Sequence, residues 1–192
     1  MKLSAASLRR LELRRVRGMW FRAIPKKHWK TALRTDHTSG IVTRYNPGAA
    51  AKTPYEILYL AENPTVALYE VGAIFGPPDR PIPNPEQRYS IIEVNVSLQS
   101  IVDLTDASQQ GLLDVSLQEL TGNWDTYDPG AAPTQRLGAA LFATKGVEGL
   151  VAISAKMPRC RTLIVFPEKL RMGSGLIFED PILRKTHRID PR

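Results

Sequence analysis

The amino-acid sequence predicts an α+β fold: a single compact domain in which a mixed central sheet is surrounded by helices. The chain has 192 residues, a length typical of one domain, and 43% of them are hydrophobic, which is enough for an ordinary globular core. Strand-like and helix-like segments follow one another too irregularly for a chain of repeated strand–helix–strand units. The sequence contains no internal repeat and no segment of low complexity.

The first segments combine a basic helix with short strands. The apolar residues Leu3, Leu8 and Leu11 predict an amphipathic helix over residues 1–18, separate from the main domain, which ends near Gly18. The next expected elements are strands over Met19–Ile24, Ile41–Tyr45 and Ile57–Ala61 and a helix over His28–Leu33.

The helix that follows has the clearest local signals. Asn63 can cap it, Pro64 suits its first position, and its run continues to Phe75. The remaining expected elements are strands over Tyr89–Ser97, Ser100–Leu104, Gly149–Ile153 and Thr162–Phe166 and helices within Ala107–Leu120 and Thr134–Thr144. On this basis the main domain covers residues 19–180, and a polar tail covers residues 181–192.

Basic residues are concentrated at the N-terminus. Residues 1–17 carry six basic side chains against the single acidic Glu12, which accounts for +5 of the net charge of +7. The rest of the chain is close to neutral, so we do not expect a broad phosphate-binding face. A solvated basic helix is the simpler interpretation, and docking onto an acidic partner or nucleic acid is the alternative.

Other sequence features limit the cellular setting and the chemistry. The single cysteine, Cys160, excludes an internal disulfide, and no apolar run is long enough to span a membrane, so we expect a cytoplasmic protein without a membrane partner. No glycine-rich dinucleotide fingerprint follows a strand, and no phosphate-binding loop is present. The three histidines are scattered, and they give no metal-ligand spacing. We therefore expect neither a metal nor a resident cofactor.

Two charged residues stand in apolar segments. Glu70 is the only charged residue between Asn63 and Gly76, and Arg22 lies in the apolar strand Met19–Ile24. A carboxylate on an apolar helix face points into the protein or into a cleft, where it needs a cationic partner or a catalytic use. An internal salt bridge between Arg22 and Glu70 is therefore as well supported as a functional site.

Three more residues stand at the ends of expected elements. Arg44 precedes a tight turn, Tyr59 lies in a strand before the Glu70 helix, and Ser154 follows the strand Gly149–Ile153. Singly they are explained as a surface arginine, a core aromatic and a turn residue. Together with Arg22 and Glu70 they suit a substrate with a diphosphate, a planar ring and a glycosidic bond, because arginines bind phosphate and a carboxylate stabilises positive charge on a sugar.

The order of motifs resembles the RES domain over about residues 19–170. The matching segments are Phe21-Arg22-Ala23-Ile24, Thr43-Arg44-Tyr45-Asn46-Pro47-Gly48, Leu58-Tyr59-Leu60-Ala61-Glu62-Asn63-Pro64, Ala67-Leu68-Tyr69-Glu70-Val71, Thr134-Gln135, Gly146-Val147-Glu148-Gly149-Leu150, Ile153-Ser154-Ala155 and Leu163-Ile164-Val165-Phe166. The family usually has glycine where Thr43 stands, tryptophan where Tyr45 stands and, in some members, an aromatic where Ala23 stands.

The resemblance implies a fold similar to the ADP-ribosyltransferase toxins, with NAD bound in a central cleft and consumed as a substrate. Family members cleave the nicotinamide–ribose bond, with water, phosphate or a protein side chain as acceptor. They are toxins neutralised by an Xre-type antitoxin that covers the cleft, and nucleic acid is contacted only through that antitoxin. The resemblance implies catalytic roles for Glu70, Arg44 and Ser154 and NAD-binding roles for Arg22, Arg44, Tyr59 and Tyr45.

Three alternatives to NAD degradation stay open from the sequence. The first is mono-ADP-ribosylation of a host protein, which uses the same site. The second is a non-enzymatic nucleic-acid-binding protein that uses the basic residues 2–17. The third is an inactive family member that acts only as a binding partner.

Overall fold

The strands form a seven-stranded mixed sheet that partly closes on itself. The computed structural model describes all 192 residues. The strands of this sheet are β1 (Leu13–Pro25), β4 (Leu58–Ala61), β7 (Tyr89–Asp103), β8 (Gly149–Ile153), β9 (Arg161–Val165), β10 (Gly175–Asp180) and β11 (Lys185–Ile189). Their order is β1-β4-β9-β8-β7-β10-β11, and β1 also pairs with β7, so five strands form a closed ring of pairings. The pair β7–β8 is parallel and the other pairs are antiparallel, which confirms the expected mixed sheet and α+β class.

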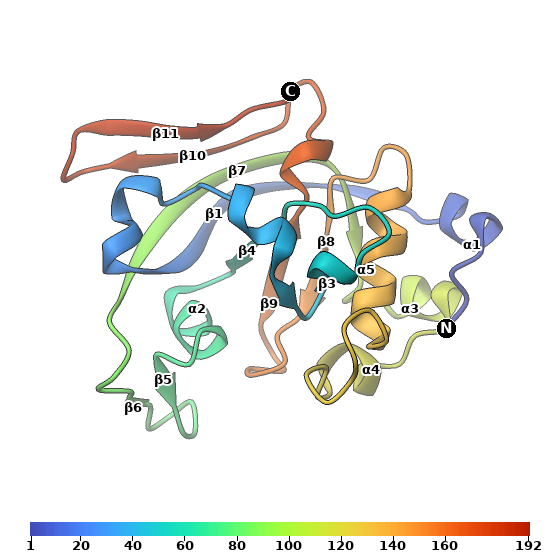
Figure 1. Cartoon of the computed structure of the whole chain (residues 1–192), viewed down its shortest axis with the longest axis horizontal. Helices are drawn as coiled ribbons and strands as arrows, with labels where there is room; N and C mark the ends of the chain where they lie inside the picture. The colour runs from blue at the N-terminus through green and yellow to red at the C-terminus, as the bar shows by residue number, and fades with distance from the viewer.

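The helices lie around this sheet in two groups. They are α1 (Ala5–Arg9), α2 (Pro64–Glu70), α3 (Ala107–Leu113), α4 (Leu117–Thr121) and α5 (Pro133–Ala143). Two small hairpins accompany them, β2 (Val42–Thr43) with β3 (Asn46–Pro47) and β5 (Ile74–Phe75) with β6 (Ile82–Pro83). Figure 1 shows α3, α4 and α5 at one end of the sheet and α2 with β5 and β6 at the other. No helix of the chain has the length and apolar character needed to cross a membrane.

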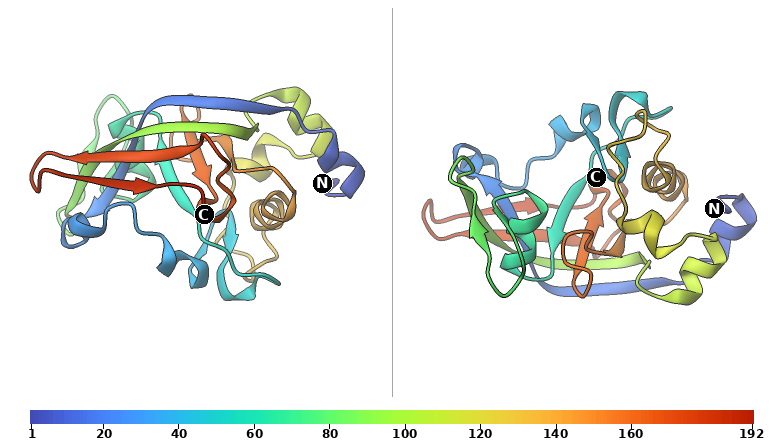
Figure 2. Two further views of the ribbon diagram at one scale, coloured as in Figure 1. Left: turned by 90° about the horizontal axis from the view of Figure 1, so that it is seen from above. Right: turned by 90° about the horizontal axis from the view of Figure 1, so that it is seen from below.

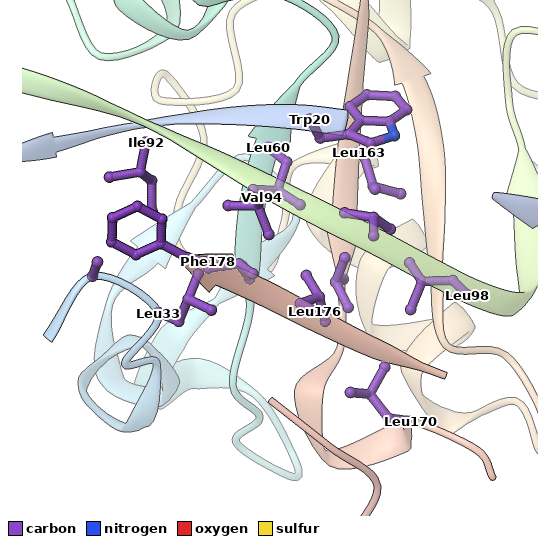
Figure 3. Packing of buried hydrophobic residues seen from close by; sticks show 14 of the residues in the cluster. Trp20, Leu33, Leu60, Ile92, Val94, Leu98, Leu163, Leu170, Leu176 and Phe178 are labelled. Atoms are coloured by element: carbon purple, nitrogen blue, oxygen red, sulfur yellow. The ribbon is translucent and has the colours of Figure 1, made fainter. Parts of the chain in front are cut away.

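Strand β9 lies between the two parts of the hydrophobic core. Leu163 and Val165 belong to a cluster that also contains Trp20 and Leu60, whereas Ile164 belongs to a second cluster. Figure 3 shows side chains of the first cluster, from β1, β4, β7, β9 and β10, pointing into a common interior. A strand segment buried on both faces is expected to be apolar without alternation, as Leu163–Val165 is.

The second cluster packs the helices against the sheet. In it the rings of Tyr55 and Phe142 are stacked with centroids 4.4 Å apart, and Phe166 meets both rings edge-on. Phe142 belongs to α5, so this aromatic group fixes α5 to the end of β9. The contact places α5 beside the β2–β3 hairpin, which Gly138 approaches so closely that a Cβ there would lie 2.0 Å from the Tyr45 carbonyl oxygen.

The predicted basic helix over residues 1–18 is wrong over most of its length. Only Ala5–Arg9 is helical, and the chain from Leu13 onward belongs to β1. Antiparallel pairing with β7, from Leu13 opposite Val102 to Pro25 opposite Tyr89, overrides the weak local helical pattern. Figure 2 shows this long strand running beside β7 along the molecule.

Half of the six N-terminal basic residues lie in strand β1. Arg14 forms ion pairs with Asp103 and Asp106 at 3.4 and 2.6 Å, while Arg15 and Arg17 are exposed. On its other edge β1 pairs with β4 only at Phe21. The arginines thus stand along an open strand edge, where charge is a common protection against unwanted pairing.

The middle of the chain follows the predictions with shorter elements. Asn63 caps α2 by accepting a 3.0 Å hydrogen bond from the Val66 amide, as expected, but the helix ends at Glu70 instead of Phe75. Gly72 has a φ of +69°, a left-handed conformation that ends helices, and Phe75 then pairs with β6. The expected helix at His28–Leu33 is a 3₁₀ helix over Lys26–Thr31, and the expected strand Ile41–Tyr45 is reduced to β2.

The predicted polar tail over residues 181–192 is not a separate segment. Residues 185–189 form β11, which pairs with β10 from Asp180 opposite Lys185 to Leu176 opposite Ile189. His187 stacks on Phe178 of the core cluster, with ring centroids 5.5 Å apart. The polar sequence is that of an edge hairpin with one solvated face.

We predict that Asp180 stabilises this hairpin in a pH-dependent way. Its buried carboxylate accepts hydrogen bonds from the Trp29 indole and from the Ile182 and Leu183 amides, at 2.8, 2.8 and 2.9 Å. Burial alone raises the pKa of Asp180, but the hydrogen bonds outweigh it and hold the pKa below its usual value. The stabilisation is therefore present above the unfolded-state pKa of about 4 and is lost as the pH falls through the lower folded-state pKa.

Thermal denaturation of Asp180→Asn and the unmodified protein as a function of pH checks this. The variant should have the lower Tm at neutral pH, and the difference should shrink as the pH is lowered below about 4. A difference that stays constant across this range would contradict the assignment.

Candidate functional site

Glu70 and Ser154 meet because two strands end at the same edge of the sheet. Strand β9 pairs antiparallel with both β4 and β8, with Thr162 opposite Ala61 and Arg161 opposite Ile153. The carboxyl ends of β4 and β8 therefore lie together. The chain leaves β4 into α2, whose last residue is Glu70, and Ser154 directly follows β8.

Ser154 is a buried residue that orients the Glu70 carboxylate. Its hydroxyl donates to Glu70 Oε1 at 2.5 Å, and it accepts from the amides of Met157 at 3.0 Å and Lys156 at 3.3 Å. Ser154 has an exposed fraction of 0%, whereas Glu70 is exposed. With its proton committed to Glu70 and its oxygen to backbone amides, Ser154 is placed as a positioning residue.

Most of the expected site residues line one cavity. It has a volume of about 450 Å³, within the usual range of small-molecule sites. Those that line it are Arg22, Arg44, Tyr45, Tyr59 and Glu70. Ser154 lies behind this wall, since its neighbours Ile153 and Ala155 line the cavity and it does not. The structure thus brings together residues from β1, the β2–β3 hairpin, β4, α2 and the end of β8.

Arg22 offers a cationic group with no protein partner to this cavity. Its Nη1 atom is buried and makes no hydrogen bond, and no carboxylate lies within ion-pair distance. The alternative in which Arg22 and Glu70 form an internal salt bridge is therefore excluded. Burial lowers the pKa of Arg22 to about 10, so the guanidinium is still charged at neutral pH. A buried cation without a partner favours an anionic ligand.

The two tyrosines of the cavity differ in their hydroxyl groups. Tyr59 is tied to the β2–β3 hairpin: its hydroxyl bonds the Thr43 hydroxyl at 2.8 Å and accepts from the Tyr45 amide at 3.0 Å. Burial raises the pKa of Tyr59 to about 12. The hydroxyl of Tyr45 is buried without any partner, and burial raises its pKa too. Tyr45 thus has a free donor, while Tyr59 supplies a fixed ring.

Arg44 is engaged with backbone rather than standing free. Its Nη1 donates to the carbonyl oxygens of Gly122 at 2.8 Å and Leu120 at 3.2 Å, at the C-terminal end of α4. The last carbonyls of a helix lack partners within the helix, and a cation is favourable there. Arg44 therefore lines the cavity, but some of its hydrogen-bond donors are already bound to backbone carbonyls of the protein.

Sequence reasoning missed part of the cavity wall. Asn123, Trp124 and Asp125 line it from the loop after α4, and Lys156 lines it from the turn after Ser154. The only signal for the first group was a tryptophan in a polar loop. Arg44 and this loop are distant in sequence, and the hydrogen bond that joins them spans 78 residues.

The chemical capacity of the site follows from these groups. An uncompensated guanidinium and a free phenol can bind phosphate oxygens or other anions. A carboxylate held in one orientation can stabilise a positive charge that develops beside it. Aromatic side chains supply flat walls for a planar ring.

Comparison with known proteins gives one family and one fold. The family model of the RES domain matches residues 19–182. A chain in the crystal structure of the M. tuberculosis MbcT–MbcA toxin–antitoxin complex is similar in structure, with a TM-score of 0.63 and 15% sequence identity, over 98% of this chain and 94% of that chain. No curated protein matches the sequence. Because the family model covers most of the chain, and the structural likeness agrees with it, this chain belongs to the RES-domain family.

Proposed function

We propose that the chain degrades NAD by cleaving the bond between nicotinamide and ribose. One observation carries this proposal: a single cavity contains a half-buried guanidinium without a protein partner, at Arg22, and a carboxylate held in place by a buried serine, at Glu70. NAD has the two matching features, a diphosphate and a positively charged glycosidic leaving group.

Arg22 is the group that we assign to the diphosphate. Its guanidinium donates no hydrogen bond to the protein, and only Nη1 is closed off from solvent, so the remaining donors can form charge-assisted hydrogen bonds with a phosphate oxygen that enters the cavity. The buried hydroxyl of Tyr45 is a second donor without a partner in the same cavity.

Glu70 is the catalytic residue. As the bond from C1′ to the nicotinamide nitrogen breaks, its electron pair leaves with nicotinamide, which becomes neutral, and positive charge moves onto the ribose. A nearby carboxylate stabilises this oxocarbenium-like state electrostatically. The leaving group needs no proton, so one oriented carboxylate suffices for this step. An acceptor then attacks C1′.

Ser154 acts through Glu70, and we predict a partial effect of its removal. Ser154→Ala loses the 2.5 Å hydrogen bond that orients the carboxylate, so kcat should fall roughly ten- to hundredfold with KM little changed. Steady-state kinetics measures this, and Ser154→Thr, which keeps a hydroxyl, should recover part of the rate. Complete loss of turnover in Ser154→Ala would instead indicate a nucleophilic serine.

The family and the fold support a biological setting for this activity. The structural neighbour belongs to a toxin–antitoxin complex, and a protein that consumes NAD would stop growth if nothing restrained it. We propose that the chain is the toxin of such a pair and that an Xre-type antitoxin blocks the cavity. Co-expression with the product of a neighbouring antitoxin gene should then restore growth and give a stable complex.

The proposed reaction is tested by following NAD loss with the purified protein, with and without inorganic phosphate. Chromatography should show nicotinamide released in step with NAD loss. A phosphate requirement identifies a phosphorylase, and its absence identifies a hydrolase. Label from NAD that stays on protein in a host lysate would indicate ADP-ribosylation instead, and no NAD loss under any of these conditions would overturn the proposal.

A further inference from the structure

The loop from Gly122 to Gly130 is fixed at both ends to the β2–β3 hairpin. At its start, Arg44 donates to the Gly122 carbonyl at 2.8 Å. At its end, the Gly130 amide donates to Gln135 Oε1 at 2.7 Å, and the same Gln135 side chain donates to the Thr43 carbonyl at 3.0 Å. Gln135 is fully buried, on the first turn of α5. The two clamps therefore come from adjacent hairpin residues, Thr43 and Arg44.

The start of the loop is also confined by close packing. A Cβ at Gly122 would lie 2.6 Å from the Gln118 carbonyl oxygen, so the chain leaves α4 along one tightly packed path. This path and the Arg44 hydrogen bond together determine where the next residues lie. Those residues, Asn123, Trp124 and Asp125, line the cavity.

No side-chain hydrogen bond holds Trp124 in the cavity wall. Its side chain is half-buried, and its indole makes no hydrogen bond within the protein. The two tyrosines of the cavity are held by their own side chains: Tyr45 is fully buried, and the Tyr59 hydroxyl is hydrogen-bonded to Thr43 of the hairpin. The hydrogen bonds that fix the position of the indole are therefore those that clamp the two ends of its loop.

We propose that Trp124 is the face on which a planar heteroaromatic ring of the dinucleotide stacks, and that Arg44 and Gln135 are positioning residues that hold it there. The inference rests on the proposed function, because it assumes that NAD enters this cavity. With this proposal Arg44 is no longer expected to bind the diphosphate directly. It is expected to affect NAD binding by holding the loop that carries Trp124.

A double-mutant cycle separates the two roles of Arg44. The measurements use the Glu70→Gln protein, in which turnover is expected to be at least about a hundredfold slower, so that binding of NAD can be followed by titration calorimetry. Trp124→Ala should weaken NAD binding roughly five- to hundredfold, the usual range for loss of a stacked aromatic. Arg44→Met alone should weaken binding to a similar extent, but it should have less than about a twofold effect once Trp124 is alanine.

Gln135→Leu gives a second test of the clamps that does not change the charge of the cavity. Gln135→Leu should weaken NAD binding in the protein that keeps Trp124. In the protein that already carries Trp124→Ala, it should weaken NAD binding little further. The matched control is Tyr127→Ala, since Tyr127 lies on the same loop, is 49% exposed and does not line the cavity. This variant should bind NAD as the parent does.

Tryptophan fluorescence distinguishes stacking from a purely structural role of Trp124, because only a ring stacked on the indole should quench its emission. NAD should quench tryptophan emission in the Glu70→Gln protein and should no longer do so in Trp124→Phe, in which Trp20 and Trp29 remain as internal references. Nicotinamide mononucleotide and AMP, tested separately, show which ring stacks, because only the matching half should quench.

The outcomes separate this inference from the proposed function. Unchanged NAD affinity in Trp124→Ala, or an Arg44→Met effect of equal size in both backgrounds, would overturn the stacking role or the positioning role while NAD binding itself stands. No NAD binding by the Glu70→Gln protein, with no cleavage by the unmodified protein, would overturn the proposed function and this inference with it.

Discussion

Glu70→Gln should lower the kcat for NAD cleavage by at least about a hundredfold and leave KM nearly unchanged. Glutamine has the same shape and can still accept the hydrogen bond from Ser154, so the change removes the negative charge and little else. The loss of one preorganised electrostatic contact to a transition state costs roughly two to three orders of magnitude in rate. Kinetics with chromatographic detection of nicotinamide measures the effect.

Two controls accompany this prediction. The Tm of Glu70→Gln should equal that of the unmodified protein, because Glu70 is exposed and pairs only with Ser154. Asp125→Asn removes another carboxylate that lines the cavity and should reduce kcat by less than about tenfold. Turnover of NAD by Glu70→Gln at the normal rate would refute the role that we assign to this residue.

Glu148→Leu should cause the largest loss of stability among single substitutions that leave the cavity untouched. On one edge of β7, residues 95–97 pair with β10 and residues 101–103 pair with β8. Between them, the amides of Gln99 and Ser100 donate to Glu148 Oε2 at 2.8 and 2.7 Å, and the Arg171 amide donates to Oε1 at 2.8 Å. Glu148 is fully buried, so leucine would leave the Ser100 and Arg171 amides unpaired, while the Gln99 amide would keep only the Ser174 hydroxyl at 3.2 Å.

The expected cost is at least about 2 kcal/mol, because each of the two unpaired buried donors costs roughly 1–3 kcal/mol. For a domain of this size that lower bound corresponds to a fall in Tm of roughly 4–8 °C. Glu93→Leu makes the same chemical change on the exposed face of β7 and should shift the Tm little. An unfolding curve for Glu148→Leu that matches the unmodified protein would contradict this account.

The sequence predicted those features of the fold that depend on local signals. The helix cap at Asn63 and the alternation of buried and exposed residues in β7 depend only on residues close together in the sequence, and both were confirmed. The strand predicted over Met19–Ile24 is the second half of β1, but the first half, residues 13–18, was predicted as a helix because its pairing partner, β7, lies far away in the chain. Local spacing cannot report a pairing whose stabilisation comes from a distant strand.

In the site, too, the features that depend on local sequence were predictable and those that depend on tertiary packing were not. Glu70 and Arg22 were recognisable because each is a charged residue in an apolar segment, which needs an explanation wherever it occurs. The Ser154–Glu70 hydrogen bond joins residues 84 positions apart, and it follows only from the shared edge of β4 and β8. The engagement of Arg44 with the end of α4 and the place of Trp124 in the cavity wall likewise depend on tertiary packing.

The most direct test of the account is a crystal structure of the Glu70→Gln protein with NAD. We expect the dinucleotide in the cavity, with a diphosphate oxygen within hydrogen-bond distance of the Arg22 guanidinium and the nicotinamide-bearing ribose beside residue 70. NAD bound outside this cavity, or bound within it with the diphosphate away from Arg22, would contradict the account.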